Sequence, residues 1–228
     1  MPTRWRRCMQ AWIFARRSER VLAHIRAMVF AAALLPLLRL VALGHADALG
    51  ANPVEFVTRS TGTWALVMLC VTLSVSPLKQ LLGWPRLLRL RRMLGLYAFF
   101  YAALHFGAWV WFDQWFDLAS MTADVVDRPF VTVGLTAFAL MLPLAATSTH
   151  AMMRRLGRRW QELHRLVYAV AVLAVLHFWW HKAAKNDLAE PMIYAAVVAL
   201  LLGLRVLRRL AHRAPVGASA RQAPLERE

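Results

Sequence analysis

Six apolar stretches dominate this sequence, and each approaches the length of about 20 residues with which a helix crosses a bilayer. Hydrophobic residues occupy 60% of the 228 positions. Because backbone polar groups must be satisfied within the hydrocarbon layer, such stretches fold as helices. We therefore predict an all-α polytopic membrane protein, a six-helix bundle with spans over residues 27–44, 62–78, 94–112, 130–147, 163–180 and 191–207.

Charged residues alternate in sign from one connection between the spans to the next. Most of the 28 lysines and arginines lie before the first span, in the second and fourth connections, and after the last span. The other connections carry the acidic residues Asp47, Glu55, Asp113, Asp117, Asp124, Asp127, Asp187 and Glu190. Since basic loops stay in the cytoplasm, we predict a multi-pass membrane protein with both termini cytoplasmic. This topology accounts for the net charge of +16, so nucleic acid is not an expected partner.

The chain divides into three parts by composition. We expect a basic cytoplasmic tail over residues 1–26, a transmembrane domain over 27–207, and a second basic cytoplasmic tail over 208–228. The first apolar run is longer than the core of a secretory signal and contains Arg39, so we expect it to be retained as a helix. The aromatic and basic residues ahead of it fit either an interfacial helix on anionic lipid or a disordered tail.

Three histidines lie in or beside strongly apolar segments. His105 belongs to the third span, and His164 and His177 belong to the fifth. Ionisable side chains at membrane depth are costly and usually functional, and imidazole is a frequent ligand of haem iron. The third and fifth spans run in the same direction, and a rise of about 1.5 Å per residue puts His105 and His177 at similar depth. We therefore expect these two histidines to hold one haem in the periplasmic half of the membrane.

His164 precedes His177 by about 20 Å of helix, so the two cannot share one iron. His164 would instead serve a second haem, a flavin or a propionate near the inner surface. The alternative for each of the three histidines is a plain hydrogen bond between helices. His181, one turn beyond His177, is either a substitute ligand or a solvated surface residue. The remaining histidines, His24, His45, His150 and His212, are expected to be solvated.

Several motifs match one known family. They are the stretch 91–97 followed by Leu104-His105, the triplet Thr147-Ser148-Thr149, and the stretch 158–168 with His177 further along. The Ser76-Pro77-Leu78 turn and the Arg128-Pro129 pair before the fourth span agree as well. Over about residues 30–210, the chain resembles the haem-binding membrane subunit of the periplasmic methionine-sulfoxide reductase system, the MsrQ family.

This resemblance implies a ferric-reductase-like domain that carries b-type haem and is associated with FMN. The haem histidines of the family fall on His105, His164 and His177. Larger relatives use a fourth histidine, whose position falls around Arg91 or Arg92 here. Arginine does not replace imidazole on iron, so the sequence leaves the ligation of any inner haem open.

By the same resemblance, the chain is expected to be an electron-transfer subunit and not the catalytic one. Electrons would pass from a cytoplasmic flavin reductase or the quinone pool to a periplasmic molybdopterin-containing methionine-sulfoxide reductase, which repairs oxidised proteins. Arg91, Arg92 and Arg158 would attract propionates or an FMN phosphate, or would only enforce the topology. The alternative is a small polytopic transporter without a cofactor, which Pro36 with Arg39 and Pro143 suggest.

Overall fold

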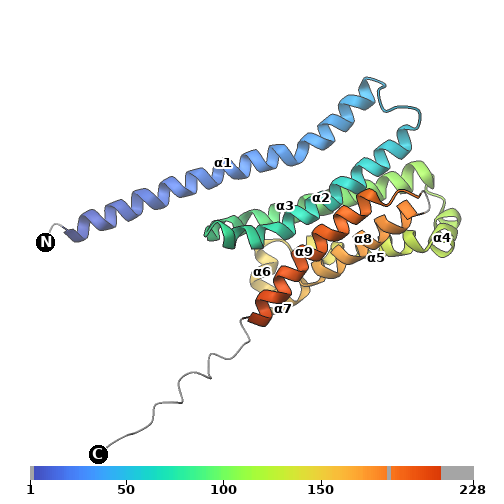
Figure 1. The fold of residues 1–228 in the computed structure, drawn as a ribbon. Helices are drawn as coiled ribbons and strands as arrows, with labels where there is room; N and C mark the ends of the chain where they lie inside the picture. The colour runs from blue at the N-terminus through green and yellow to red at the C-terminus, as the bar shows by residue number, and fades with distance from the viewer. Residues whose placement is uncertain (1–2, 184–185, 212–228) are drawn as a thin grey trace, which may run out of the picture.

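The computed structural model describes residues 3–183 and 186–211, with side chains from residue 19 onward. In this part of the chain, six helical segments are long and apolar enough to cross a membrane, which confirms the predicted six-helix membrane fold. They cover Glu19–His45, Pro53–Leu81, Pro85–Asp113, Pro129–Ala146, Arg158–Ala183 and Ala189–Ala211. The start of the first helix and the end of the last lie at the same end of the bundle (Figure 1).

The long helices are α1 (Thr3–His45), α2 (Pro53–Leu81), α3 (Leu88–Ala108), α5 (Pro129–Ala146), α8 (Leu166–Ala183) and α9 (Ala189–Ala211). Short elements connect them: η1 (Pro85–Leu87), the π-helical turn η2 (Trp109–Asp113), α4 (Leu118–Asp127), α6 (His150–Leu156) and α7 (Arg158–Leu163). The closest packing joins α2 to α3 and α5 to α8. The bundle is therefore built from two antiparallel helix pairs, with α9 beside α8 and α1 along the outside (Figure 1).

Local sequence signals set where the two helix pairs begin. The side chain of Asn52 accepts a hydrogen bond of 3.1 Å from the backbone N–H of Glu55, and Pro53 occupies the first turn of α2. Pro129 begins α5 in the same way. Gly157, with φ of 52°, adopts the left-handed region between α6 and α7.

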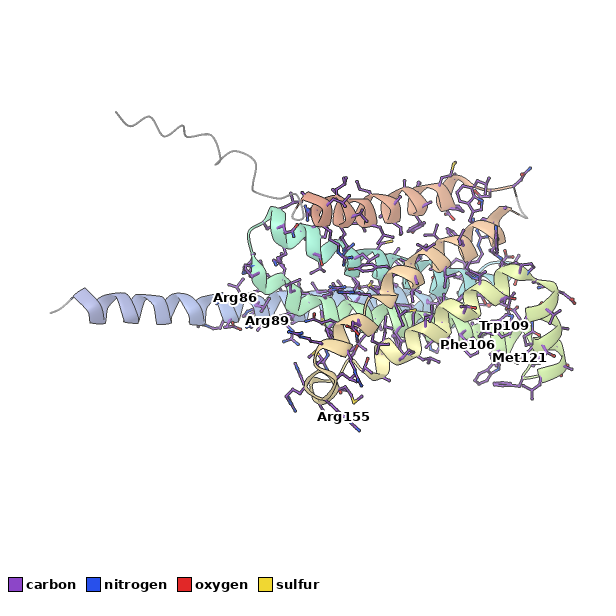
Figure 2. All side chains as sticks on the ribbon, turned by 90° about the horizontal axis from the view of Figure 1, so that it is seen from below. Arg86, Arg89, Phe106, Trp109, Met121 and Arg155 are labelled. Carbon is purple, nitrogen blue, oxygen red and sulfur yellow. The ribbon has the colours of Figure 1, made fainter. Side chains whose placement is uncertain are left out.

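The two ends of the bundle differ in charge. We call the end that holds α4 and the α1–α2 and α8–α9 connections the acidic end, and the end that holds η1, α6 and α7 the basic end. Figure 2 shows Arg86, Arg89 and Arg155 at the basic end, and Trp109 and Met121 at the other. At the basic end, Glu19 of α1 pairs with Arg89 at 2.7 Å and with Arg86 at 3.5 Å.

Two tyrosines attach α1 to the bundle. The hydroxyl of Tyr101 donates to the carbonyl of Ala33 at 2.7 Å, and that of Tyr97 donates to the carbonyl of Phe30 at 3.2 Å. Tyr101 is only 1% exposed, so its hydroxyl needs this partner inside the apolar bundle. The segment expected as an N-terminal tail is helical from Thr3 and continues into the first span without a break. Residues 212–228 of the second expected tail lie outside the described part of the chain.

The fifth span differs from the continuous helix predicted over residues 163–180. Helix α7 ends at Leu163, α8 begins at Leu166, and His164 lies in the turn between them. The Nδ1 atom of His164 and its own backbone N–H both lie 3.0 Å from the carbonyl oxygen of Trp160. A side chain that competes for a carbonyl of the helical ladder is a recognised cause of such interruptions.

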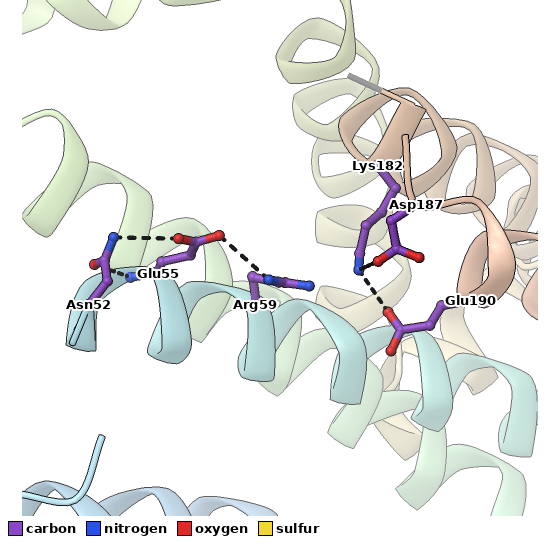
Figure 3. Close-up of polar contacts among 6 residues, drawn as sticks. All are labelled: Asn52, Glu55, Arg59, Lys182, Asp187 and Glu190. Carbon is purple, nitrogen blue, oxygen red and sulfur yellow. Dashed lines mark hydrogen bonds and ion pairs between the residues drawn. The ribbon is translucent and has the colours of Figure 1, made fainter. Parts of the chain in front are cut away.

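A buried lysine joins α8 to α9 at the acidic end. The side chain of Lys182 is 2% exposed, and its Nζ lies 2.6 Å from a carboxylate oxygen of Asp187 and 3.0 Å from one of Glu190. Arg59 of α2 reaches towards this cluster and pairs with Glu55 at 3.5 Å (Figure 3). The contacts of Lys182 tie the end of α8 to the start of α9.

This cluster predicts an acid dependence of stability. The Lys182 ammonium donates a hydrogen bond to Asp187 and, with its charge, lowers the pKa of that carboxyl below its usual value. A lowered folded-state pKa stabilises the protein above the unfolded pKa of about 4, and this contribution is lost as the pH falls through the lower value. We expect thermal melting of the detergent-solubilised protein to show this loss below about pH 4. Lys182→Met should remove it and Glu55→Gln should not; an unchanged acid dependence in Lys182→Met would contradict the assignment.

Candidate functional site

His105 and His177 meet at the acidic end of the bundle. His105 lies near the end of α3 and His177 in the second half of α8. Their ring centroids are 6.0 Å apart, and the ring planes are inclined by 73°. The structure thus brings together the two histidines that the sequence places at similar depth.

Each of these rings is fixed through the same nitrogen. Nδ1 of His105 lies 2.8 Å from the carbonyl oxygen of Thr58 on α2, and Nδ1 of His177 lies 2.7 Å from that of Phe130 on α5. Because a carbonyl oxygen only accepts hydrogen bonds, Nδ1 carries the proton in both rings. The lone pair of each neutral imidazole is therefore on Nε2, the nitrogen that remains available as a ligand.

The two helix pairs repeat one arrangement. In each pair the accepting carbonyl precedes its histidine by 47 residues. One helical turn beyond each carbonyl is a glycine, Gly62 on α2 and Gly134 on α5. A methyl group at Gly62 would lie 3.0 Å from the ring of His105, and one at Gly134 would lie 2.6 Å from that of His177. Both rings therefore lie directly against the backbone of the neighbouring helix.

Aromatic side chains surround the pair. The ring of Phe130 lies 6.0 Å from that of His177 and 5.5 Å from that of His181. Phe106, next to His105, stacks on Phe138 of α5 with centroids 4.8 Å apart. The site therefore lies among apolar rings, where uncompensated polar atoms are costly.

One hydroxyl beside His105 lacks a partner. The Oγ1 atom of Thr58 is buried and makes no hydrogen bond, although the carbonyl of the same residue holds the His105 ring. Threonines in helices usually bond back to a carbonyl one turn earlier, as Thr61 does to the carbonyl of Val57 at 2.8 Å. An unused donor therefore lies beside the first histidine of the pair.

His164 lies at the basic end and does not join the pair. Its ring stacks on that of Trp160 with centroids 3.9 Å apart, and its Nδ1 is 3.0 Å from the carbonyl oxygen of Trp160. Its Nε2 atom is buried and has no partner. His164 and Thr58 are the two residues with such an unpartnered buried side-chain atom in the described ranges, residues 19–183 and 186–211.

Arginines surround the basic end at different depths. Arg91 and Arg92 of α3 are half-buried, whereas Arg158 is exposed. Arg205 of α9 donates to the carbonyls of Leu73 and Leu201 and lies 5.5 Å from the centroid of the Tyr168 ring. Arg205 therefore holds α9 against α2 and α8, a role that the sequence does not reveal.

The other histidines fall into two groups. His181 lies one turn beyond His177 and contacts the ring of Phe130, so it is a neighbour of the pair. His24, His45 and His150 are exposed, as expected, and His24 bonds to the carbonyl of Arg20 at 2.7 Å. His212 lies outside the described residues.

Sequence reasoning missed Gly62 and Gly134, as well as the carbonyls of Thr58 and Phe130. A signal for them exists in the sequence. The triplet Leu-His-Phe occurs at residues 104–106 and again at 176–178, and the same number of residues separates each histidine from its glycine. Two matching spacings of this kind are weak evidence until the helix pairing is known.

Comparison with known proteins agrees with this architecture. The model of a family described as the ferric reductase like transmembrane component matches residues 61–175, about half of the chain. The match begins beside Gly62 and ends within α8, so it covers α3, α5 and most of both helix pairs. Fold and match together define a ferric-reductase-like transmembrane protein.

Individual relatives identify a narrower family than this model does. A protein of Bordetella pertussis named protein-methionine-sulfoxide reductase heme-binding subunit MsrQ is 60% identical over 189 residues, which cover 83% of this chain and 92% of that protein. Proteins of the same name from Ralstonia nicotianae and Polaromonas naphthalenivorans are 63% identical over 186 residues and 45% over 217 residues. The match to the Ralstonia protein covers 81% of this chain and 86% of that protein. The match to the Polaromonas protein covers 92% of this chain and 99% of that protein. The chain therefore belongs to the MsrQ family.

Proposed function

We propose that this chain is the electron-transfer subunit of a methionine-sulfoxide reductase system, in which His105 and His177 would hold one b-type haem. The observation that carries the proposal is the pair of rings, each with Nδ1 bonded to a carbonyl and Nε2 left as the ligand atom. The relatives are named heme-binding subunits, which supports the same cofactor here.

The distance between the rings fits this assignment. Two metal–imidazole bonds of about 2 Å each, extended by half the width of each ring, separate the centroids by roughly 6 Å. The observed separation is 6.0 Å. Metal-bound histidines typically donate their other N–H to a carboxylate or a backbone carbonyl, as both rings do here.

A bare metal ion fits less well. In the described ranges, no group of three or more His, Cys, Asp or Glu side chains is placed to hold a metal ion. Two imidazoles leave the remaining positions of an iron to other donors, and a porphyrin supplies them. Bis-histidine haem is a one-electron carrier without an open coordination site, so it suits relay and not substrate chemistry.

The protein contributes position and environment to this relay. The carbonyls of Thr58 and Phe130 fix the tautomer and orientation of the two rings and increase the basicity of Nε2. The surrounding aromatic rings exclude water, which lowers the local dielectric. We therefore assign no catalytic residue to this chain.

We propose a second cofactor position at the basic end. The buried Nε2 of His164 has no protein partner, which fits an iron or a polar atom of a bound group. The fourth histidine of larger relatives falls around Arg91 or Arg92, and an arginine there does not ligate iron but would pair with an acidic group such as a propionate or a phosphate. A second haem or the FMN that the resemblance implies are the two candidates for this position, and cofactor extraction would distinguish them.

We propose further that the basic end faces the cytoplasm, with both termini there, in a bacterial inner membrane. Electrons from a cytoplasmic flavin reductase or from quinone would enter near His164 and leave through the His105–His177 pair. The acceptor would be a periplasmic molybdopterin-containing catalytic subunit that reduces methionine sulfoxide. The distribution of basic and acidic residues between the two ends supports this direction.

The alternative of a cofactor-free transporter has little support. Transporters of that kind use helices that are discontinuous near the middle of the membrane. Here α1 continues through Pro36 and α5 continues through Pro143 without unwinding, and Arg39 is exposed on α1.

The ligation is tested by substitution. We expect His105→Ala and His177→Ala each to remove most of the low-spin haem absorbance of the purified protein, because each would remove one of the two imidazoles that would hold the iron. His177→Met should keep a six-coordinate haem and raise its potential, since methionine–histidine ligation does so. His150→Ala, at an exposed histidine, is the matched control. Unchanged haem content and spectrum in both alanine variants would refute the pairing.

His164 is expected to behave differently from the pair. His164→Ala should leave the low-spin signal of the acidic-end haem in place and should reduce the content of the second cofactor or the rate at which the haem is reduced. Cofactor quantification and stopped-flow reduction would measure both effects. Loss of the same signal as in His177→Ala would show that His164 belongs to the same site.

The direction of transfer is tested in vesicles. A membrane-impermeant reductant should reduce the haem faster in inverted vesicles, where the basic end is outside, than in right-side-out vesicles. Single cysteines placed at exposed Arg89 and at exposed Asp117 report the orientation by labelling from either side. Labelling of the Arg89 position from the periplasmic side would overturn the proposed topology.

A further inference from the structure

The closest contacts of the two histidines are made with glycine. A Cβ atom at Gly134 would lie 2.6 Å from Nδ1, 2.8 Å from Cε1 and 3.2 Å from Cγ of His177. At Gly62 the corresponding atom would lie 3.0 Å from both Nδ1 and Cε1 of His105 and 3.5 Å from Cγ. No other residue than glycine fits at Gly134 without moving the ring, and Gly62 leaves little more room.

Neither ring can move away from its glycine without losing its hydrogen bond to the neighbouring carbonyl. The carbonyl that accepts from Nδ1 lies one turn before the glycine on the same helix, so carbonyl and glycine face the ring together. The ring of His177 thus lies in a cradle formed by the carbonyl of Phe130 and the bare backbone of Gly134. A ring pushed off Gly134 would lose the 2.7 Å hydrogen bond that fixes its tautomer.

Glycine is a poor residue for the interior of a helix. Gly62 lies inside α2 and Gly134 inside α5, and both helices continue through it. By contrast, a Cβ at Gly107 of α3 or Gly203 of α9 would meet nothing within 4 Å. A side chain at Gly62 or Gly134 would therefore collide with a histidine ring, whereas a side chain at Gly107 or Gly203 would enter open space.

We propose that Gly134 and Gly62 are positioning residues that set the orientation of the two histidine rings and maintain their hydrogen bonds to Phe130 and Thr58. The proposal rests on the haem ligation proposed above, to which it adds the residues that orient the ligands. Gly134 has the greater influence, because its contact with Nδ1 of the ring is 2.6 Å, whereas that of Gly62 is 3.0 Å. The two rings therefore owe their inclination of 73° to the backbones of α5 and α2.

The test compares three glycine-to-alanine variants of the full chain. Gly134→Ala should weaken binding of haem to the cofactor-free protein by about 10- to 100-fold, the range usual when the outer partner of a metal-bound histidine is lost. Gly62→Ala should weaken it less, because its ring needs to shift by only a few tenths of an ångström. Gly107→Ala, two residues beyond His105 and exposed, is the control and should bind as the unchanged protein does.

Electron paramagnetic resonance separates positioning from plain stability. The g values of a low-spin bis-histidine haem depend on the relative orientation of the two ring planes, so Gly134→Ala and Gly62→Ala should shift them and Gly107→Ala should not. Thermal melting of each cofactor-free variant shows whether it is folded. If Gly134→Ala does not fold, Gly62→Ala decides the question, and unchanged g values and affinity in it would overturn the proposal.

The histidine variants distinguish this proposal from the one on which it rests. If His177→Ala keeps the low-spin haem, the ligation itself is wrong. If His177→Ala loses the haem while folded Gly134→Ala binds it with unchanged affinity and g values, the ligation holds and the positioning role of Gly134 is wrong.

Discussion

The need to satisfy polar imidazoles inside an apolar bundle governs this structure. Each of the three histidines at or near membrane depth binds a backbone carbonyl through Nδ1: His105 that of Thr58, His177 that of Phe130, and His164 that of Trp160. A carbonyl of a helix already accepts one hydrogen bond from its own ladder and has a second lone pair for the ring. The bundle thus stabilises three neutral imidazoles, and in each of them Nε2 is left for another partner.

This constraint explains why the helices are arranged as two similar pairs. A ring reaches a carbonyl on a neighbouring helix only if the two backbones are close, and glycine at the contact allows that approach, as Gly62 and Gly134 show. The Asn52 cap and the proline in the first turn of α5, Pro129, then place the start of α2 and of α5 at the level of the histidines. Helix ends, glycines and ligand positions therefore depend on one another.

The sequence predicted the part of this arrangement that follows from hydrophobicity and from chain length. Six spans, their alternating charge and the similar depth of His105 and His177 were all accessible, because helix rise and loop charge are properties of short segments. The accepting carbonyls, the interruption at His164 and the role of Arg205 were not accessible, because they depend on which helices are neighbours. The repeated Leu-His-Phe triplet indicates a repeated site only once the helix pairs α2–α3 and α5–α8 are known.

In the proposed function, an electron would cross the bundle from the basic end to the acidic end. His164 precedes α8 and His177 lies in its second half, so helix rise separates the two levels by roughly 15–20 Å. Stacked rings of Phe99, Phe138 and Phe106 occupy the region between α3 and α5 and keep it apolar. Because such a region solvates no charge, an electron needs a defined carrier at each end. Under this proposal, the buried and unpartnered Nε2 of His164 would lie at the carrier position of the basic end, and the histidine pair at that of the acidic end.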